Sequence, residues 1–201
     1  MRHELRVEGA FVRLRPIRVE DAPFVAELRG APERAKHLHR GDTSVEAQER
    51  WLRAYEDRAG DYYFVIERVA DAGPEGLVGI YDVTDREAEW GRWILRPGSL
   101  AAAESALLTY RCAFEGLGLP ELYCRTLARN ASVVSFHDSA GARRAGVLPA
   151  HFEIDGERLD AVEHRVGAGE WPGVRERLGR IAEAVAMRAR RAERVERAGT
   201  P

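Results

Sequence analysis

Residues 89–130 contain a strand, a turn and a helix start whose order could bind an anionic cofactor. An apolar and aromatic run at 90–95 is followed by a Pro97-Gly98 break and then by an alanine-rich segment that is typical of a helix start. The first N–H groups of a helix lack intrahelical partners and lie at the positive end of the helix dipole, so they bind anions. Because small residues let a ligand approach the backbone, we expect a phosphorylated cofactor to bind at this junction.

Length and composition limit the classes of protein to consider. The 201 residues suit one domain, at 1–168, with an appended charged segment at 169–201. The formal net charge is -2 and the basic residues are spread along the chain, which argues against nucleic-acid binding. Cys112 and Cys124 lack C-x-x-C spacing, and no apolar run approaches the roughly 20 residues that cross a bilayer. We expect a cytoplasmic protein with no membrane contact.

The first half of the chain predicts the elements that lead into this junction. The expected order is a strand, two helices and three antiparallel strands, at residues 11–17, 20–30, 43–55, 62–66, 77–83 and 88–95. Thr43 or Ser44 caps the second helix, in a T-x-x-E capping box. Residues 35–41, between the two helices, have no clear period and are expected to be irregular.

The second half predicts a helix, a strand, a helix, a hairpin and a long helix, at residues 100–114, 122–127, 130–141, 147–154 with 159–166, and 174–197. A helix between two strands is the crossover that a parallel pair requires, so strands 88–95 and 122–127 should be parallel. Asp155-Gly156 is typical of a tight hairpin turn. The long helix has a narrow apolar stripe that would pack on the domain or on a second copy in a homodimer; an RNA contact through its arginines is the alternative.

This order resembles the Gcn5-related N-acetyltransferase (GNAT) fold, in particular its ribosomal-protein and amino-sugar branch. Four motifs carry the resemblance: Val12-Arg13-Leu14-Arg15-Pro16-Ile17 with Glu20-Asp21, Glu89-Trp90-Gly91-Arg92-Trp93 before Pro97, Asn130 with His137 and Gly141, and Phe152 with Asp155-Gly156 and Asp160-Ala161-Val162. It covers roughly residues 11–166. The implied α/β (α+β) fold has a mixed, mostly antiparallel sheet flanked by helices, a parallel pair of strands that splays apart, and here a C-terminal helical extension.

The resemblance implies acetyl-coenzyme A as cosubstrate, held where the parallel strands part near Arg96. Pantetheine is implied to lie beside Ile94, Leu95 and Arg96 and to bond the side chain of Asn130. The phosphates are implied to rest on Gly98, Ser99, Leu100, Ala101, Ala102 and Ala103. This loop is shorter than the family pattern and lacks one glycine and the basic residue, which Arg96 could replace. The alternatives are an ordinary strand-to-helix turn and, for Asn130, a helix N-cap.

The implied reaction needs a neutral amine and a proton for the departing thiolate. His137 lies where many relatives carry a tyrosine acid, and imidazole can donate a proton near neutral pH. A buried histidine bonded to a carbonyl is the alternative. The carboxylate that some relatives carry before the asparagine is Arg125 here, so Asp82 and Glu89 remain as candidate bases. For either one, a solvated carboxylate at a strand end is the alternative.

Four further residues are candidate contacts of the acceptor. His37 and His39 belong to the irregular segment that lies over the acceptor site in this fold, and they could contact the substrate or serve as the base. Trp90 could stack on a sugar or a base, and Arg92 could bind a substrate phosphate. Exposed loop histidines and core tryptophans are the alternatives. No metal is implied.

The resemblance therefore implies transfer of an acetyl group to a primary amine of a small molecule. It is nearest to acetyltransferases of nucleotide-linked 4-amino sugars of the pseudaminic-acid type, which makes a nucleotide-activated amino sugar the expected acceptor. Two alternatives stay open. One is an acceptor at a protein N-terminus, as in the ribosomal-protein relatives, and the other is a non-catalytic regulator that binds coenzyme A.

Overall fold

The computed structural model describes residues 3–31 and 41–198, and the side chains of these ranges up to residue 188. His37 and His39 therefore lie outside the described residues. The strands are β1 (Val7–Glu8), β2 (Val12–Pro16), β3 (Tyr62–Arg68), β4 (Pro74–Tyr81), β5 (Glu87–Leu95), β6 (Glu121–Leu127), β7 (Arg143–Ile154) and β8 (Glu157–Gly167). The helices are η1 (Val19–Asp21), α1 (Ala22–Gly30), α3 (Val45–Tyr55), α4 (Ala102–Arg111), η2 (Cys112–Gly116), α5 (Ala131–Ala140) and α6 (Trp171–Ala198).

The strands form one sheet in the order β1-β2-β3-β4-β5-β6-β8-β7. Every neighbouring pair is antiparallel except β5 and β6, which are parallel. The predicted order of strands and helices and the predicted parallel pair are confirmed. The short strand β1 was not predicted, because two residues are too few to show a period.

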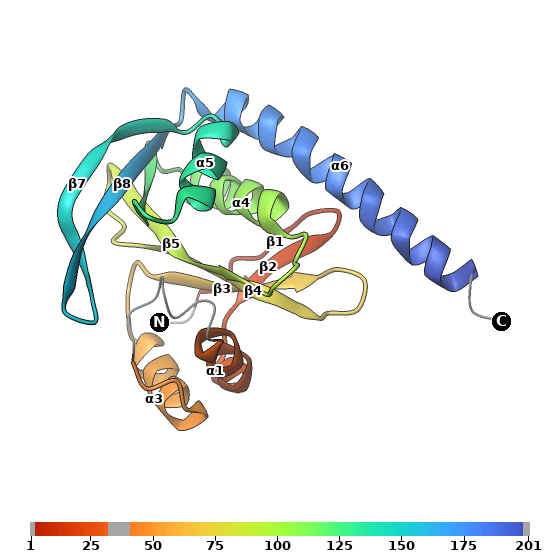
Figure 1. Cartoon of the computed structure of the whole chain (residues 1–201), viewed down its shortest axis with the longest axis horizontal. Helices are drawn as coiled ribbons and strands as arrows, with labels where there is room; N and C mark the ends of the chain where they lie inside the picture. Colours follow the sequence, from red (N-terminus) through yellow and green to blue (C-terminus); the bar gives the residue numbers. More distant parts are fainter. Residues whose placement is uncertain (1–2, 32–40, 199–201) are drawn as a thin grey trace.

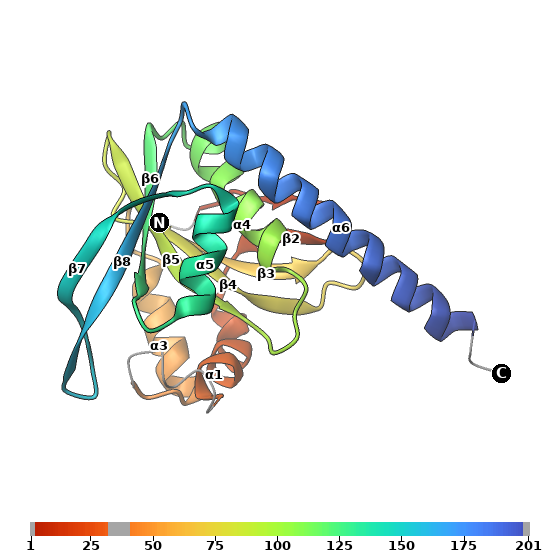
Figure 2. The same cartoon turned by 45° about the horizontal axis from the view of Figure 1, so that its top comes forward.

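Helices cover both faces of the sheet (Figures 1 and 2). On one face, α4, α5 and the first turns of α6 pack on a core that includes Phe64, Ile66 and Leu122. On the opposite face, α1 and α3 pack on a second core that includes Tyr63 and Val65. Successive residues of a strand point to opposite faces, so β3 contributes to both cores and is buried almost throughout.

The long C-terminal helix begins as part of the main core and then extends beyond the sheet (Figure 1). Trp171, Val174 and Leu178 are buried in the same cluster as residues of α4. The sequence analysis left two packing partners open, the domain itself and a second copy. The first turns of α6 pack on the domain itself. Within the described residues, none of the helices combines the length and the apolar character needed to span a membrane.

The element boundaries differ from the predicted ones in local detail. Ser44, not Thr43, caps α3, and its Oγ accepts a hydrogen bond from the Ala47 N–H at 3.3 Å. The helix that was predicted as one piece after Leu100 is α4 followed by the π-helical turn η2. At the end of α5, Gly141 adopts φ 90°, which glycine allows without a steric penalty.

A bulge interrupts the regular alternation of side chains along β5 between Trp90 and Trp93. Gly79 pairs with Gly91, but Leu77 pairs with Ile94, so β5 contains one extra residue at this point. Arg92 adopts φ 51° within this bulge. As a result Trp90 and Trp93 lie on the same face of the sheet, with ring centroids 5.5 Å apart.

The parallel strands separate earlier than the sequence suggested. Their register pairs are Glu87 with Glu121, Ala88 with Leu122 and Glu89 with Tyr123. Strand β6 continues to pair with β8 as far as Leu127. The predicted parting near Arg96 is therefore wrong, since the strands diverge directly after Glu89.

Glu104 of α4 ties the β1–β2 turn to the helix. Its carboxylate accepts hydrogen bonds from the N–H groups of Ala10, Phe11 and Val12 at 2.6, 2.8 and 2.7 Å. The carboxylate lies so close to Gly9 that a Cβ added there would come within 2.5 Å of Oε1. One buried acid thus satisfies three backbone donors that no β-ladder reaches.

We expect Glu104→Gln to lower the free energy of unfolding by about 1 to 3 kcal/mol, because an amide oxygen replaces a charged acceptor in a buried site. Urea denaturation followed by circular dichroism measures the change. The control is Glu176→Gln, whose carboxylate is exposed and pairs with Arg180 one turn along α6; it should shift the midpoint little. Equal midpoints for the two variants would show that the anchor contributes nothing.

Candidate active site

A cleft of about 480 Å³ opens where β5 and β6 diverge. Its walls come mainly from residues 89–95 of β5, residues 124–127 of β6, the start of α5 and the tip of the β7–β8 hairpin. Arg29 of α1 and Tyr81 of β4 complete the lining. Since α4 and α5 lie on one face of the sheet and α1 on the other, the cleft has two chemically different sides (Figure 2).

His137 lies on the α5 side of the cleft and corrects the expectation of an acid with a pKa near neutrality. The side chain is 2% exposed, and its ring packs against those of Trp90, Phe136 and His164. Burial, with a smaller effect of His164, lowers the pKa of His137 to about 3. At neutral pH the ring is therefore uncharged, with Nε2 3.6 Å from the Cys124 sulfur.

Trp90 is a core residue, which corrects its expected role in stacking on an acceptor. Although the residue borders the cleft, it is 1% exposed, and its ring packs edge-on against Tyr110 at 5.4 Å. Trp93 is less buried; its Nε1 donates to the Ser105 Oγ at 3.1 Å, and its ring packs against Phe136. The two tryptophans attach β5 to α4 and α5 rather than presenting a free face.

Asn130 lines the cleft at the start of α5. Its side chain makes no capping hydrogen bond to the helix backbone, so the alternative of a helix N-cap is not realised through its side chain. Instead its Oδ1 accepts a hydrogen bond from the Ser132 hydroxyl at 3.1 Å. The side-chain amide nitrogen has no hydrogen-bond partner within the described part of the chain.

The loop before α4 leaves the helix start without a side-chain cap. Gly98 adopts φ 73°, and the Ala101 N–H donates to the Ser99 Oγ at 3.2 Å. Ala101 and Ala103 are buried, whereas Ala102 is half-buried. Arg96, the expected replacement cation, pairs with Glu27 of α1 at 3.1 Å and does not line the cleft.

Glu89 lies on the opposite side of the cleft, at the point where the strands part. It is 8% exposed, receives a hydrogen bond from Arg125 at 3.0 Å, and lies 3.3 Å from the Tyr81 hydroxyl, which can donate to it. A Cβ added at Gly91 would come within 2.4 Å of that hydroxyl, so the glycine makes this contact possible. Burial raises the pKa of Glu89, and the nearby Arg125 only partly opposes this effect.

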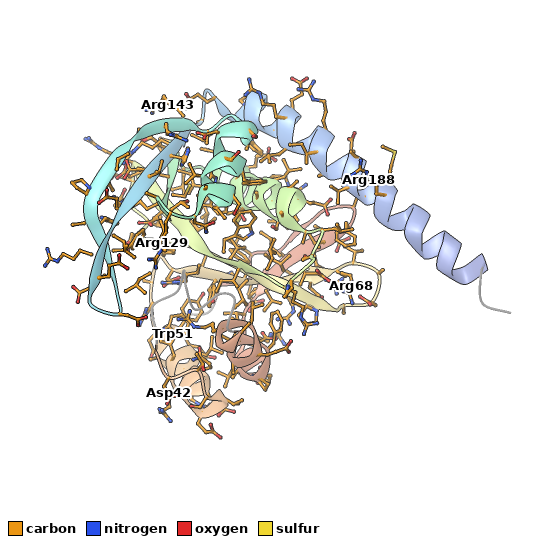
Figure 3. All side chains as sticks on the ribbon, in the orientation of Figure 1. Asp42, Trp51, Arg68, Arg129, Arg143 and Arg188 are labelled. Atoms are coloured by element: carbon orange, nitrogen blue, oxygen red, sulfur yellow. The ribbon has the colours of Figure 1, made fainter. Side chains whose placement is uncertain are left out.

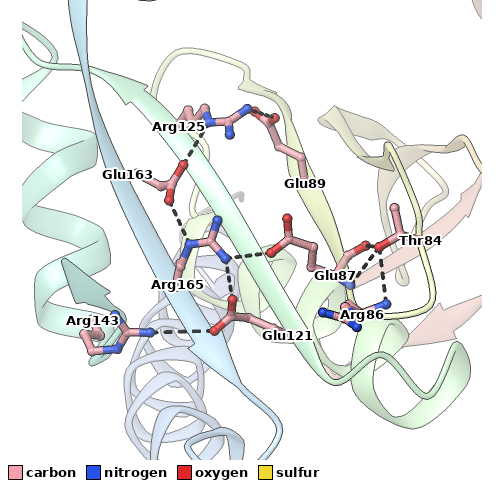
Figure 4. A network of polar contacts seen from close by, with 9 residues as sticks. All are labelled: Thr84, Arg86, Glu87, Glu89, Glu121, Arg125, Arg143, Glu163 and Arg165. Carbon is pink, nitrogen blue, oxygen red and sulfur yellow. Dashed lines mark hydrogen bonds and ion pairs between the residues drawn. The ribbon is translucent and has the colours of Figure 1, made fainter. Parts of the chain in front are cut away.

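A network of ion pairs holds β5, β6 and β8 together beside the cleft (Figure 4). Arg125 links Glu89 to Glu163, with both contacts at 3.0 Å. Arg165 then links Glu163 to Glu87 and Glu121. Burial also opposes ionisation of Glu163, but hydrogen bonds from Arg165 and Arg125 outweigh it, so its pKa is lowered. Two carboxylates on one arginine therefore differ in the direction of their pKa shifts.

Arg92 is already paired, which corrects its expected role as a phosphate ligand. Its guanidinium makes two hydrogen bonds to the Asp61 carboxylate, at 2.6 and 2.9 Å. It also lies over the rings of Tyr81, Tyr63 and Trp51, the last on α3 at the lower side of Figure 3. Asp61 and these rings occupy the guanidinium, so Arg92 supports the wall of the cleft.

The lining of the cleft excludes one residue that the sequence predicted and includes one that it did not. Asp82 is exposed, adopts φ 53° after β4 and does not line the cleft, so it is not positioned as a base there. Arg29, which sequence reasoning missed, lines the cleft from the last turn of α1. No motif contains Arg29, and only the folded structure brings it to the site. Among the described residues, no three His, Cys, Asp or Glu side chains group as metal ligands.

Comparison with known proteins agrees with this geometry. Residues 12–143 match the family described as "Acetyltransferase (GNAT) domain". The solved structure of apo FdhC, a nucleotide-linked sugar GNAT, is similar with a TM-score of 0.75 and 25% identity, over 90% of this chain and 99% of that one.

Two further solved structures show the same fold. A GCN5-related N-acetyltransferase from Brucella melitensis is similar with a TM-score of 0.76 and 20% identity, over 87% of this chain and 83% of that one. A mutant of the spermidine N-acetyltransferase SpeG from Vibrio cholerae is similar with a TM-score of 0.71 and 20% identity, over 81% and 97%. None of the curated proteins matches the chain.

Proposed function

Because the chain belongs to the GNAT acetyltransferase family and is an N-acetyltransferase, we propose that it acetylates the primary amine of a nucleotide-activated amino sugar. The observation that carries the proposal is the two-sided cleft. One side has an open strand edge and Asn130, and the other has a buried carboxylate with a raised pKa. The first side suits a phosphorylated thioester and the second an amine.

The residues of the α5 side fit acetyl-coenzyme A. Beyond Glu89, the edge of β5 that faces β6 has no strand partner among the described residues, so backbone groups along this edge can bond pantetheine. The side-chain amide of Asn130 faces the same cleft. The uncapped start of α4, at Ala102 and Ala103, would hold the diphosphate. When bound, the cosubstrate supplies the acetyl group as an activated thioester.

Glu89 is the base in this proposal. An alkyl amine is protonated at neutral pH and must lose that proton before or during its attack on the thioester carbonyl. A carboxylate with a raised pKa accepts the proton more readily than a solvated one, and Glu89 lines the cleft where the amine would enter. The tetrahedral adduct then expels coenzyme A as a thiolate, which takes the second proton of the amine nitrogen. Glu89 releases the first proton to solvent, and Arg125 stabilises its ionised form between turnovers.

We expect Glu89→Gln to lower kcat by roughly 10²-fold or more, because the amide cannot accept the amine proton. The matched control is Glu163→Gln, which removes the other carboxylate on Arg125 but lies outside the cleft lining. It should keep most of kcat. Steady-state release of coenzyme A thiol measures both variants.

Thermal unfolding of Glu89→Gln and Glu163→Gln shows whether a loss of kcat comes from lost catalysis or from lost stability. The raised pKa of Glu89 means that its ionised form is less favourable in the folded than in the unfolded chain. Its stabilising contribution is present below its ordinary pKa and is lost as pH rises through the raised value. The Glu89→Gln variant carries no charge at this position. At neutral pH its melting temperature should therefore be no lower than that of the wild type. Equal losses of kcat in the two variants would remove Glu89 as the base.

The acceptor is tested with a panel of amines. We expect thiol release with nucleotide-linked amino sugars to exceed that with spermidine and with peptides bearing a free N-terminus. A preference for peptides would favour the ribosomal-protein type of acceptor. Binding of acetyl-coenzyme A without turnover on any amine would favour a non-catalytic regulator.

The cosubstrate site has its own test at the start of α4. Ala102→Glu places a negative charge beside the expected diphosphate and should raise the Kd of acetyl-coenzyme A at least about 10-fold. Ala102→Gln has the same size without the charge and should bind nearly as well as the wild type. Because an acid at a helix start favours the helix, the melting temperature of Ala102→Glu should not fall. Unchanged affinity in calorimetry would place the diphosphate elsewhere.

A further inference from the structure

Arg29 is a cation of the cleft wall that has no carboxylate partner among the described residues. We propose that Arg29 binds the phosphate of the acceptor, so that this site takes amines carried on an anionic molecule and disfavours polyamines. The inference rests on the proposed function, because it assigns a residue to the acceptor of that same reaction. It replaces the expected phosphate contact at Arg92, which Asp61 already neutralises.

Pairing distinguishes Arg29 from the other arginines of the cleft wall. Of the three arginines that line the cleft within the described ranges, Arg92 is paired with Asp61, and Arg125 is paired with Glu89 and Glu163. Among the described residues, the interaction recorded for Arg29 is an electrostatic influence on the Tyr63 hydroxyl. The residue is half-buried. A partly desolvated guanidinium without a counter-charge gains more from an incoming anion than an exposed or paired one does.

The side of the sheet indicates which molecule brings the anion. Arg29 belongs to α1, which lies on the face opposite to α4 and α5 (Figure 2). Helix α4, whose start would hold the diphosphate, lies on the opposite face, and the loop that leads into it meets α1 through Arg96 and Glu27. Glu89, the proposed base, contacts Tyr81, and Arg92 lies over both Tyr81 and Tyr63 of the core under α1 and α3. Glu89 therefore shares the α1 side with Arg29. The acceptor thus meets the carboxylate with its amine and the guanidinium with its phosphate.

The same arrangement selects against polycations. A guanidinium binds phosphate through two parallel N–H donors, which provides orientation as well as affinity. A polyamine would bring a second positive charge toward Arg29 and be repelled. An amino sugar linked to a nucleoside diphosphate has both required charges, a cationic amine and an anionic diphosphate.

Binding of inorganic pyrophosphate to the protein saturated with coenzyme A tests the anion site without any turnover. We expect Arg29→Gln to raise the Kd of pyrophosphate roughly 10- to 100-fold in calorimetry, the loss of one charge-assisted, bidentate contact. Arg29→Lys should lose less. The control, Arg96→Gln, removes an arginine that also contacts α1 but lies outside the cleft, and should bind pyrophosphate as the wild type does. Equal Kd values for wild type and Arg29→Gln would overturn the proposal.

Acetyl-coenzyme A affinity and kinetics separate this proposal from the proposed function. Arg29→Gln should leave the Kd of acetyl-coenzyme A unchanged, raise KM for a nucleotide-linked amino sugar and leave KM for a neutral amino sugar unchanged. A weaker Kd for acetyl-coenzyme A with an unchanged acceptor KM would overturn the proposal by assigning Arg29 to the cosubstrate. Arg29-dependent binding of pyrophosphate without turnover on any amine would support the anion site while refuting the proposed reaction.

Discussion

The divergence of β5 from β6 after Glu89 is the constraint on which the rest of the site depends. A parallel pair normally satisfies the facing backbone groups of both strands along its length, but here the register ends after Tyr123. Strand β6 stays with β8, and the bulge at Arg92 turns β5 toward α4 and α5. The separation leaves an open edge of β5 beside Asn130 on one side of the cleft and places the Glu89 carboxylate on the other side.

Ion pairs keep the sheet intact next to this opening. Arg125 and Arg165 connect β5, β6 and β8 through four carboxylates, and both guanidinium groups lie over the ring of Tyr123. Each charge in this partly buried network has opposite charges beside it, which offsets the cost of desolvation. Glu89 is the member that faces the cleft, and for it burial outweighs pairing. The same scaffold therefore both holds the strands and raises the pKa of one carboxylate.

Local sequence was sufficient wherever short-range physics decides the outcome. The β-branched and aromatic run of β3, the glycine at the end of α5 and the Asp155-Gly156 turn each depend on neighbouring residues, and they predicted their elements. A helix between two strands was enough to predict the parallel pair, because a crossover of that length leaves no other arrangement. The early parting of the strands was not visible, since it depends on segments far apart in the chain: β6 stays paired with β8 along its other edge while β5 leaves it.

Residue type and order thus determined the fold, the family resemblance and the stretch of chain that forms the cleft. Tertiary structure alone decided which of those residues are free to act. His137 and Trp90 are enclosed by side chains from other elements, Arg92 is neutralised by Asp61, and Arg29 reaches the cleft from a helix with no motif. Burial and charge pairing arise from residues far apart in the chain, and a linear pattern carries no measure of either.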